Sequence, residues 1–211
     1  MKPLKISDIL SVLLCLSTII FGAAVYDRLP DRIVTSWSMT SGPTGTNPKA
    51  FVVFGMPIIF AVVTLLCCIY TRWLERRERA GKLAPIVRLL FPLLFIVCEV
   101  TIYLSALGKL GDIRLVVCLL VSVIMILVGN YMPKIRKNWL VGIRTPHTLM
   151  SEEIWYRTHR FAGFTVTFGG IAGVVTTLLG LYIVTFVIIM AAVFVPAIYG
   201  EAVYYLGKRE K

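Results

Sequence analysis

The stretch GIRTPHT at residues 142–148 places a guanidinium, a proline and an imidazole close together. A planar guanidinium binds a carboxylate or a phosphate through two parallel hydrogen bonds. The residue before a proline is biased toward extended geometry, and the ring of Pro146 fixes its own φ. The pattern therefore predicts that Arg144 is held on a stiffened turn. There it either binds an anionic group or pairs within its own loop, for example with Glu152 or Glu153.

The chain offers little for metal binding or catalysis. A zinc site would need its two histidines, His147 and His159, joined by Glu152 or Glu153, and their spacing matches no familiar metal motif. The five cysteines lie in apolar blocks without a CxxC pair, which favours packing over metal binding or a disulfide. The sequence has no nucleotide-binding glycine loop, nucleophile elbow or HExxH. We expect no catalytic residue, no metal and no cofactor.

Glu99 is the one charged residue deep within an apolar block. A carboxylate at the centre of a bilayer costs about 3 kcal/mol by insertion scales unless it is protonated, paired or in contact with water. Glu99 is therefore a candidate functional residue, and a structural hydrogen bond across helices explains it equally well. Glu201, near the end of the last apolar block, is expected to pair with a basic loop residue.

The elements that must position these residues are membrane-spanning helices. Apolar residues make up 58% of the 211, above the roughly 45–50% of soluble domains, and the mean hydropathy is +0.84. They are gathered into blocks about as long as a bilayer is thick. We predict an all-α integral membrane protein: a single polytopic domain over residues 1–211, with a bundle of six transmembrane helices.

The apolar blocks predict spans at about 9–26, 50–70, 89–107, 112–128, 164–179 and 182–204. The first block follows a basic segment, as in a signal peptide, but the further blocks favour an uncleaved span. The last apolar stretch is too long for one span and is expected to turn at Leu179-Gly180-Leu181-Tyr182. The two sizeable loops cover residues 27–49 and 129–163.

Lysine and arginine are distributed unevenly between the two sides of these spans. Of the 22, all but Arg28, Arg32, Lys49, Lys109 and Arg114 fall on the side of the 129–163 loop. The positive-inside rule therefore makes that loop and both termini cytoplasmic, and the 27–49 loop external. The net charge of +11 then reflects topology and attraction to anionic lipid, and does not indicate nucleic-acid binding.

Residues 151–163 predict an interfacial helix on the inner leaflet that leads into the fifth span. Ser151 is a suitable N-cap, and Glu152 and Glu153 suit the positive end of the helix dipole. Glu153 and Arg157 form an i,i+4 pair in the favourable order. One face carries Ile154, Trp155, Thr158, Phe161 and Ala162. This face fits either an ordinary amphipathic connector or a docking surface for a partner.

The 129–163 loop carries an ordered series of motifs. It reads GNYMPKIRKN at 129–138, GIRTPHTL at 142–149, tryptophan at 155 and THR at 158–160. The series resembles the signature of the SdpI family of bacterial membrane proteins, which runs approximately GNxxPKxRPN, GIRTPWTL, W, THRxxG. Lys137 stands where proline is usual, and His147 where tryptophan is usual. The candidate site in this loop comprises Asn130, Pro133, Lys134, Arg136, Asn138, Gly142, Arg144, Thr145, Pro146, His147, Thr148, Trp155, Thr158, His159 and Arg160.

The external loop resembles a second pattern, that of DUF1648, which runs approximately LPxxIPxHWxxxGxP. Its counterparts here are Leu29-Pro30, Trp37 and Gly42-Pro43, and Ser36 replaces the usual histidine. The external candidate residues are therefore Pro30, Trp37, Gly42 and Pro43.

The resemblance to the SdpI family implies an immunity and signal-transduction protein in the bacterial cell membrane. Its expected partners are the lipid bilayer, a secreted toxic peptide outside and a DNA-binding transcriptional repressor inside, with no direct contact to nucleic acid. An alternative is a membrane enzyme or small-solute transporter. It would use Glu99 in a cavity, and Arg144, His159 and Arg160 to bind an anionic lipid headgroup or substrate. A purely structural membrane scaffold is the third hypothesis.

Overall fold

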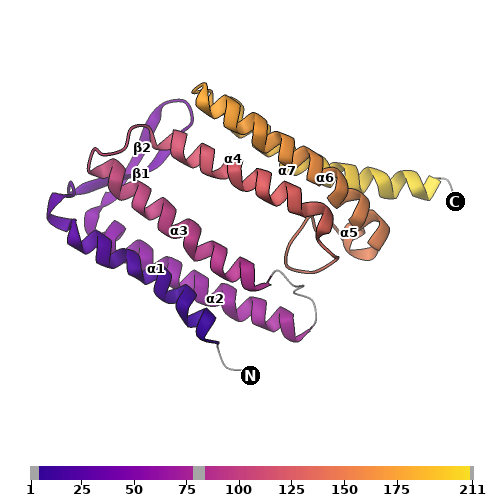
Figure 1. Cartoon of the computed structure of the whole chain (residues 1–211), viewed down its shortest axis with the longest axis horizontal. Coiled ribbons are helices and arrows are strands. Elements are labelled where there is room, and N and C mark those ends of the chain that lie inside the picture. The colour runs from indigo at the N-terminus through magenta and orange to yellow at the C-terminus, as the bar shows by residue number, and fades with distance from the viewer. Residues whose placement is uncertain (1–4, 78–83, 210–211) are drawn as a thin grey trace. The chain divides into compact units, whose positions relative to one another are not determined.

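The computed structural model describes residues 5–77 and 84–209. They form two compact units, one within Met1–Ile113 and one within Arg114–Lys211. Figure 1 shows both as helical elements, with a small sheet in the first unit.

The first unit consists of three long helices and a hairpin. The helices α1 (Ile6–Ala24), α2 (Met56–Arg76) and α3 (Ala84–Ala106) pack pairwise against one another, around a core that contains Cys15, Ala61 and Phe95. A 3-10 turn (Tyr26–Arg28) follows α1, and a π-helical segment (Phe51–Gly55) precedes α2. The antiparallel strands β1 (Arg32–Ser38) and β2 (Gly42–Pro48) lie between them in the chain, and β1 contacts α3 (Figure 1).

The second unit contains the other long helices. α4 (Ile113–Tyr131) continues into a 3-10 turn (Met132–Lys134), and α5 (Pro146–Met150) precedes α6 (Glu152–Leu178) and α7 (Tyr182–Arg209). α6 packs along α7 (Figure 1). Small residues allow the close approach: a Cβ added at Gly169 would lie 2.4 Å from the Cβ of Ala192 in α7. A Cβ at Gly170 would lie 2.7 Å from the carbonyl oxygen of Ser122 in α4.

The structure confirms the predicted bundle of six spans. Within the described residues, six helices are long and apolar enough to cross a membrane. The predicted turn between the last two spans is present, since α6 ends at Leu178, α7 begins at Tyr182 and Gly180 between them has φ +73°. An even number of spans puts both termini on one side, which is the predicted cytoplasmic side. Residues 1–4 and 210–211 lie outside the described residues.

Two features differ from the sequence-based expectation. The helix predicted at 151–163 is present, but it is not a separate element, because it continues without a break into the fifth span as α6. The external loop contains a β-hairpin that the sequence did not indicate. Its second strand, GPTGTNP, is rich in glycine and proline. Both residues are depleted in strands, so the sequence does not predict a strand there.

Candidate functional site

The segment that carries the motifs, residues 129–163, is called the motif loop below. Between α4 and α6 it contains a turn that the side chain of Asn138 stabilises. Its Oδ1 accepts hydrogen bonds from the backbone N–H groups of Leu140 and Val141, each at 2.8 Å. Its Nδ2 donates to the carbonyl oxygens of Arg136 at 2.8 Å and Val141 at 3.1 Å. All four bonds are local, and the side chain is buried. The side chain of Asn138 therefore supplies the hydrogen bonds that regular secondary structure would otherwise give these backbone groups, as short polar side chains do in turns.

His159 and Trp155 of α6 fasten both halves of the loop to the helix. The indole Nε1–H of Trp155 donates to the carbonyl oxygen of Ile135 at 2.8 Å. The backbone N–H of Ile143 donates to Nε2 of His159 at 3.1 Å, and Nδ1 of His159 lies 2.8 Å from the carbonyl oxygen of Trp155. The two rings stack with centroids 4.0 Å apart. Because Nε2 accepts a hydrogen bond, the geometry assigns the neutral ring with its proton on Nδ1.

Gly142 lies directly against these two rings. Its φ of +119° belongs to the region that favours glycine, and an added Cβ would lie 2.3 Å from Nε2 of His159. The same Cβ would lie 3.0 Å from Cη2 of Trp155. The glycine that opens the GIRTPHT motif is therefore required both by backbone conformation and by space.

Thr145 and Thr148 close the start of α5. The backbone N–H of Thr148 donates to Oγ1 of Thr145 at 3.2 Å, and the backbone N–H of Thr145 donates to Oγ1 of Thr148 at 2.9 Å. The hydroxyl of the fully buried Thr148 also donates to the carbonyl oxygen of Ile143 at 2.9 Å. With Pro146 as the first helical residue, this reciprocal cap confirms the stiffened turn that the sequence predicts.

Arg144 projects from this turn with its side chain exposed. Its Nη1 donates to the carbonyl oxygen of Trp139, so it is held within its own loop. The expected alternative partners do not hold it: Glu153 pairs with Arg157 at 2.7 Å, as predicted, and no ion pair joins Arg144 to Glu152 in the described part of the chain.

His147 replaces the usual tryptophan with a different set of contacts. Its ring stacks on Tyr204 of α7 with centroids 3.7 Å apart and an interplanar angle of 18°. Its Nδ1 is hydrogen-bonded to Oε2 of Glu201. The predicted pairing of Glu201 with a basic loop residue is therefore present. α5 is held to both α6 and α7.

The remaining residues of the motif lie near the end of α4, in the turn that follows it, and on α6. Asn130, Pro133 and Arg160 line one hollow, and Pro133, Lys134 and Arg136 line a second. Thr158 is fully buried, and its hydroxyl has no hydrogen-bond partner among the described residues. The structure thus separates a framework in which Asn138, Thr148, Trp155 and His159 are buried and Gly142 and Thr145 are half-buried from an exposed set of cations.

Comparisons with known proteins match both patterns. Residues 134–200 match the SdpI/YfhL protein family, and residues 13–61 match a domain of unknown function, DUF1648. The chain is 27% identical over 184 residues to "Immunity protein SdpI" of Bacillus subtilis (strain 168), which covers 87% of each chain. The SdpI/YfhL match covers most of the motif loop, α6 and most of α7. The chain is a multi-pass bacterial membrane protein. No solved structure matches it.

The other predicted site residues, Glu99 and those of the external loop, belong to the first unit, whereas the motif loop belongs to the second. Glu99 is 1% exposed, and its Oε1 accepts a hydrogen bond from the hydroxyl of Tyr103, one turn along α3, at 2.9 Å. In the hairpin, Trp37 pairs with Pro43, and Gly42, with φ +81°, pairs with Ser38. Pro30 is exposed and precedes β1.

A buried network of charges in the first unit was missed at the sequence level. Asp8 of α1 is 1% exposed and accepts two hydrogen bonds from Arg72 of α2, at 2.9 and 3.1 Å. Arg88 of α3 is 5% exposed, lies 3.5 Å from Asp8 and donates to Glu75 at 2.8 Å. The three helices are joined at one end by two carboxylates and two guanidiniums. The sequence does contain an indication of this network, because Asp8 is an acidic residue next to the first predicted span. Arg72 and Arg88 gave no separate indication, since the positive-inside rule alone accounts for arginines at these positions.

Proposed function

We propose that this protein gives resistance to a secreted toxic peptide and transmits its presence by binding a cytoplasmic transcriptional repressor at the membrane. The observation that carries the proposal is the similarity to an immunity protein over 87% of both chains. The folded motif loop supports the signalling half, because a fixed surface binds a partner with a smaller ordering cost than a mobile one.

The motif loop offers a partner the residue types that dominate protein interfaces. Trp139 is 45% exposed. Arg144 is also exposed, and its guanidinium donates a hydrogen bond to the carbonyl oxygen of Trp139. Met150, at the end of α5, is 75% exposed. Aromatic residues, arginine and methionine are enriched at interfaces, and tryptophan and arginine are frequent hot spots. We assign the surface of Trp139, Arg144 and Met150 to the repressor.

Transmission requires two arrangements of the helices that the peptide and the repressor bind unequally, because a ligand indifferent to both states shifts neither. The hairpin of residues 32–48 is the proposed receiving element on the external side. Its strands hold Trp37 and Pro43 in register, so a bound peptide would meet a shaped surface.

The experiment combines toxin challenge with capture of partners from native membranes. Cells that carry the wild-type gene should survive the peptide, cells without the gene should not, and the wild-type protein should retain a DNA-binding protein. Arg144→Ala should lose that protein and keep resistance. Arg157→Gln is the matched control, because Arg157 is exposed on the same segment and pairs with Glu153. Equal survival with and without the gene would refute the immunity half of the proposal. Equal capture of the DNA-binding protein by the wild type and by Arg144→Ala would refute the signalling half.

The burial of Glu99 favours a second candidate, a membrane enzyme or transporter that uses this carboxyl group. Glu99→Gln keeps an oxygen that can accept the hydrogen bond from Tyr103, so the fold should persist. If this hypothesis holds, the variant should be expressed normally and should lose all enzyme or transport activity. A fully active Glu99→Gln protein would exclude it.

A further inference from the structure

Two hollows of the second unit share one wall. The first, of about 290 Å³, lies between the end of α4 and α6, and the second, of about 570 Å³, lies between α6 and the start of the motif loop. Both are lined by Pro133. Their α6 residues include a row spaced by four: Glu152, Tyr156, Arg160, Phe164 and Phe168. Residues at this spacing form an inclined ridge that winds slowly around a helix. Because the two hollows follow this ridge and share Pro133, we treat them as one groove along α6.

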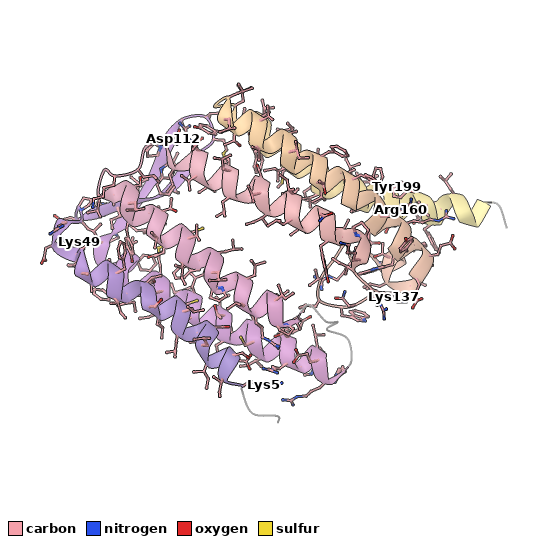
Figure 2. The ribbon with its side chains drawn as sticks, viewed as in Figure 1. Lys5, Lys49, Asp112, Lys137, Arg160 and Tyr199 are labelled. Carbon is pink, nitrogen blue, oxygen red and sulfur yellow. The ribbon has the colours of Figure 1, made fainter. Side chains whose placement is uncertain are left out.

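The character of the groove changes along its length. At the loop end it is lined by Lys134, Arg136 and Lys137, all exposed, and the one acidic residue among the lining residues is Glu152. No ion pair neutralises these three cations within residues 5–77 and 84–209. Figure 2 shows Lys137 and Arg160 at the end of the second unit that carries α5. The loop end of the groove is therefore strongly positive.

The other end of the groove is apolar and lies within the span. Phe164 and Phe168 are 59% and 65% exposed. Gly163 and Gly129 let α6 pack closely against the end of α4 beside them: a Cβ at Gly163 would lie 2.6 Å from Cγ of Pro133, and one at Gly129 would lie 2.5 Å from the backbone nitrogen of Thr167. At 1.5 Å per residue, the row from Glu152 to Phe168 extends about 24 Å along the helix. A groove of this length accommodates a headgroup and much of an acyl chain.

We propose that this groove binds an anionic phospholipid of the inner leaflet. The phosphate would lie among Lys134, Lys137 and Arg160, and one acyl chain would pack on Phe164 and Phe168. The positive charge of the loop end favours an anionic headgroup. The apolar end of the groove favours a lipid over a soluble anion, because a soluble anion has no acyl chain to pack there. Tyr156, which is 55% exposed, also lines the basic hollow, and tyrosine is enriched where membrane proteins meet lipid headgroups. This binding does not depend on the proposed immunity function.

The test is native mass spectrometry of the purified full-length protein in detergent, titrated with phosphatidylglycerol or with phosphatidylcholine. The wild type should bind phosphatidylglycerol more tightly. Lys137→Gln/Arg160→Gln should weaken that binding on the order of tenfold or more, as expected for removing two charges next to a phosphate, and leave phosphatidylcholine unchanged. Arg157→Gln is the matched control, because Arg157 is an exposed cation of α6 that lines neither hollow.

Each outcome decides between sources of the ligand. Inorganic phosphate in excess should not displace phosphatidylglycerol; complete displacement would mean a site for free phosphate and would overturn the proposal. Equal affinity for the two lipids, or equal loss in Arg157→Gln, would also overturn it. Circular dichroism checks that the double variant folds, and Phe168→Ser provides a second variant, expected to weaken both lipids.

Discussion

The backbone N–H of Ile143 donates a hydrogen bond to Nε2 of His159 across 3.1 Å, and this bond joins the motif loop to α6. His159→Leu would leave that N–H without its partner. A buried group left unpaired costs about 1–3 kcal/mol. We expect a lower free energy of unfolding in detergent and faster proteolysis within residues 135–151. Wild-type stability and wild-type cleavage together would contradict the assigned role of the imidazole.

Gly142→Ala should destabilise the same loop through sterics alone. The added Cβ would overlap Nε2 of His159, and the φ of +119° is one that side chains rarely adopt. Left-handed backbone costs roughly 1–2 kcal/mol for a residue with a Cβ, before the overlap is counted. Thermal unfolding of the purified protein measures the effect. Gly111→Ala is the matched control, since no atom lies within 4 Å of its added Cβ, and an equal loss in both variants would refute the argument.

Much of the fold followed from the sequence because a bilayer imposes a simple rule: each span needs about 20 apolar residues. All six spans and the turn at Gly180 were predicted on that basis. Hydropathy alone does not give the ends of the helices, because a helix can continue past the apolar block into charged residues. The start of α6 at Glu152, twelve residues before the apolar block, followed instead from Ser151, which caps the helix as predicted.

The candidate site was predicted as a set of residues, but the roles within it were not. The motif marked His159 and Arg160 as neighbours, and the structure buries the first and exposes the second. Which side chains hold the loop and which face outward depends on contacts between α5, α6 and α7, and on partners as distant in sequence as His147 and Glu201. Sequence spacing alone carries no information on such pairs.

The pair of His147 and Glu201 gives a third prediction, a coupling between α5 and α7. We expect His147→Ala and Glu201→Gln each to destabilise the protein, and the double variant to lose less than the sum. The interaction energy should fall in the range of about 0.5–3 kcal/mol typical of residues in contact. Chemical denaturation of the four proteins in detergent measures it. Strict additivity would mean that the hydrogen bond contributes nothing to the packing of α5.

His147→Trp separates the two contacts of that imidazole. The indole should keep the aromatic stacking on Tyr204 and lose the present hydrogen bond to Glu201. We expect its stability to lie between those of the wild type and His147→Ala. A value below that of His147→Ala would show that the site has no room for the larger ring.

The charge network of the first unit should be the most sensitive polar feature of the protein. Asp8→Asn would remove the buried carboxylate that Arg72 and Arg88 share, leaving the half-buried Arg72 and the buried Arg88 with Glu75 alone. Breaking a buried ion pair by removing one partner costs about 3–5 kcal/mol. Lys49→Gln is the matched control, because its partner Asp31 is 95% exposed and such surface pairs contribute about 0–1 kcal/mol. Thermal unfolding in detergent should therefore show a large loss for Asp8→Asn and little change for Lys49→Gln. Similar small losses in both would mean that packing between α1, α2 and α3, and not the buried charges, holds this end of the unit together.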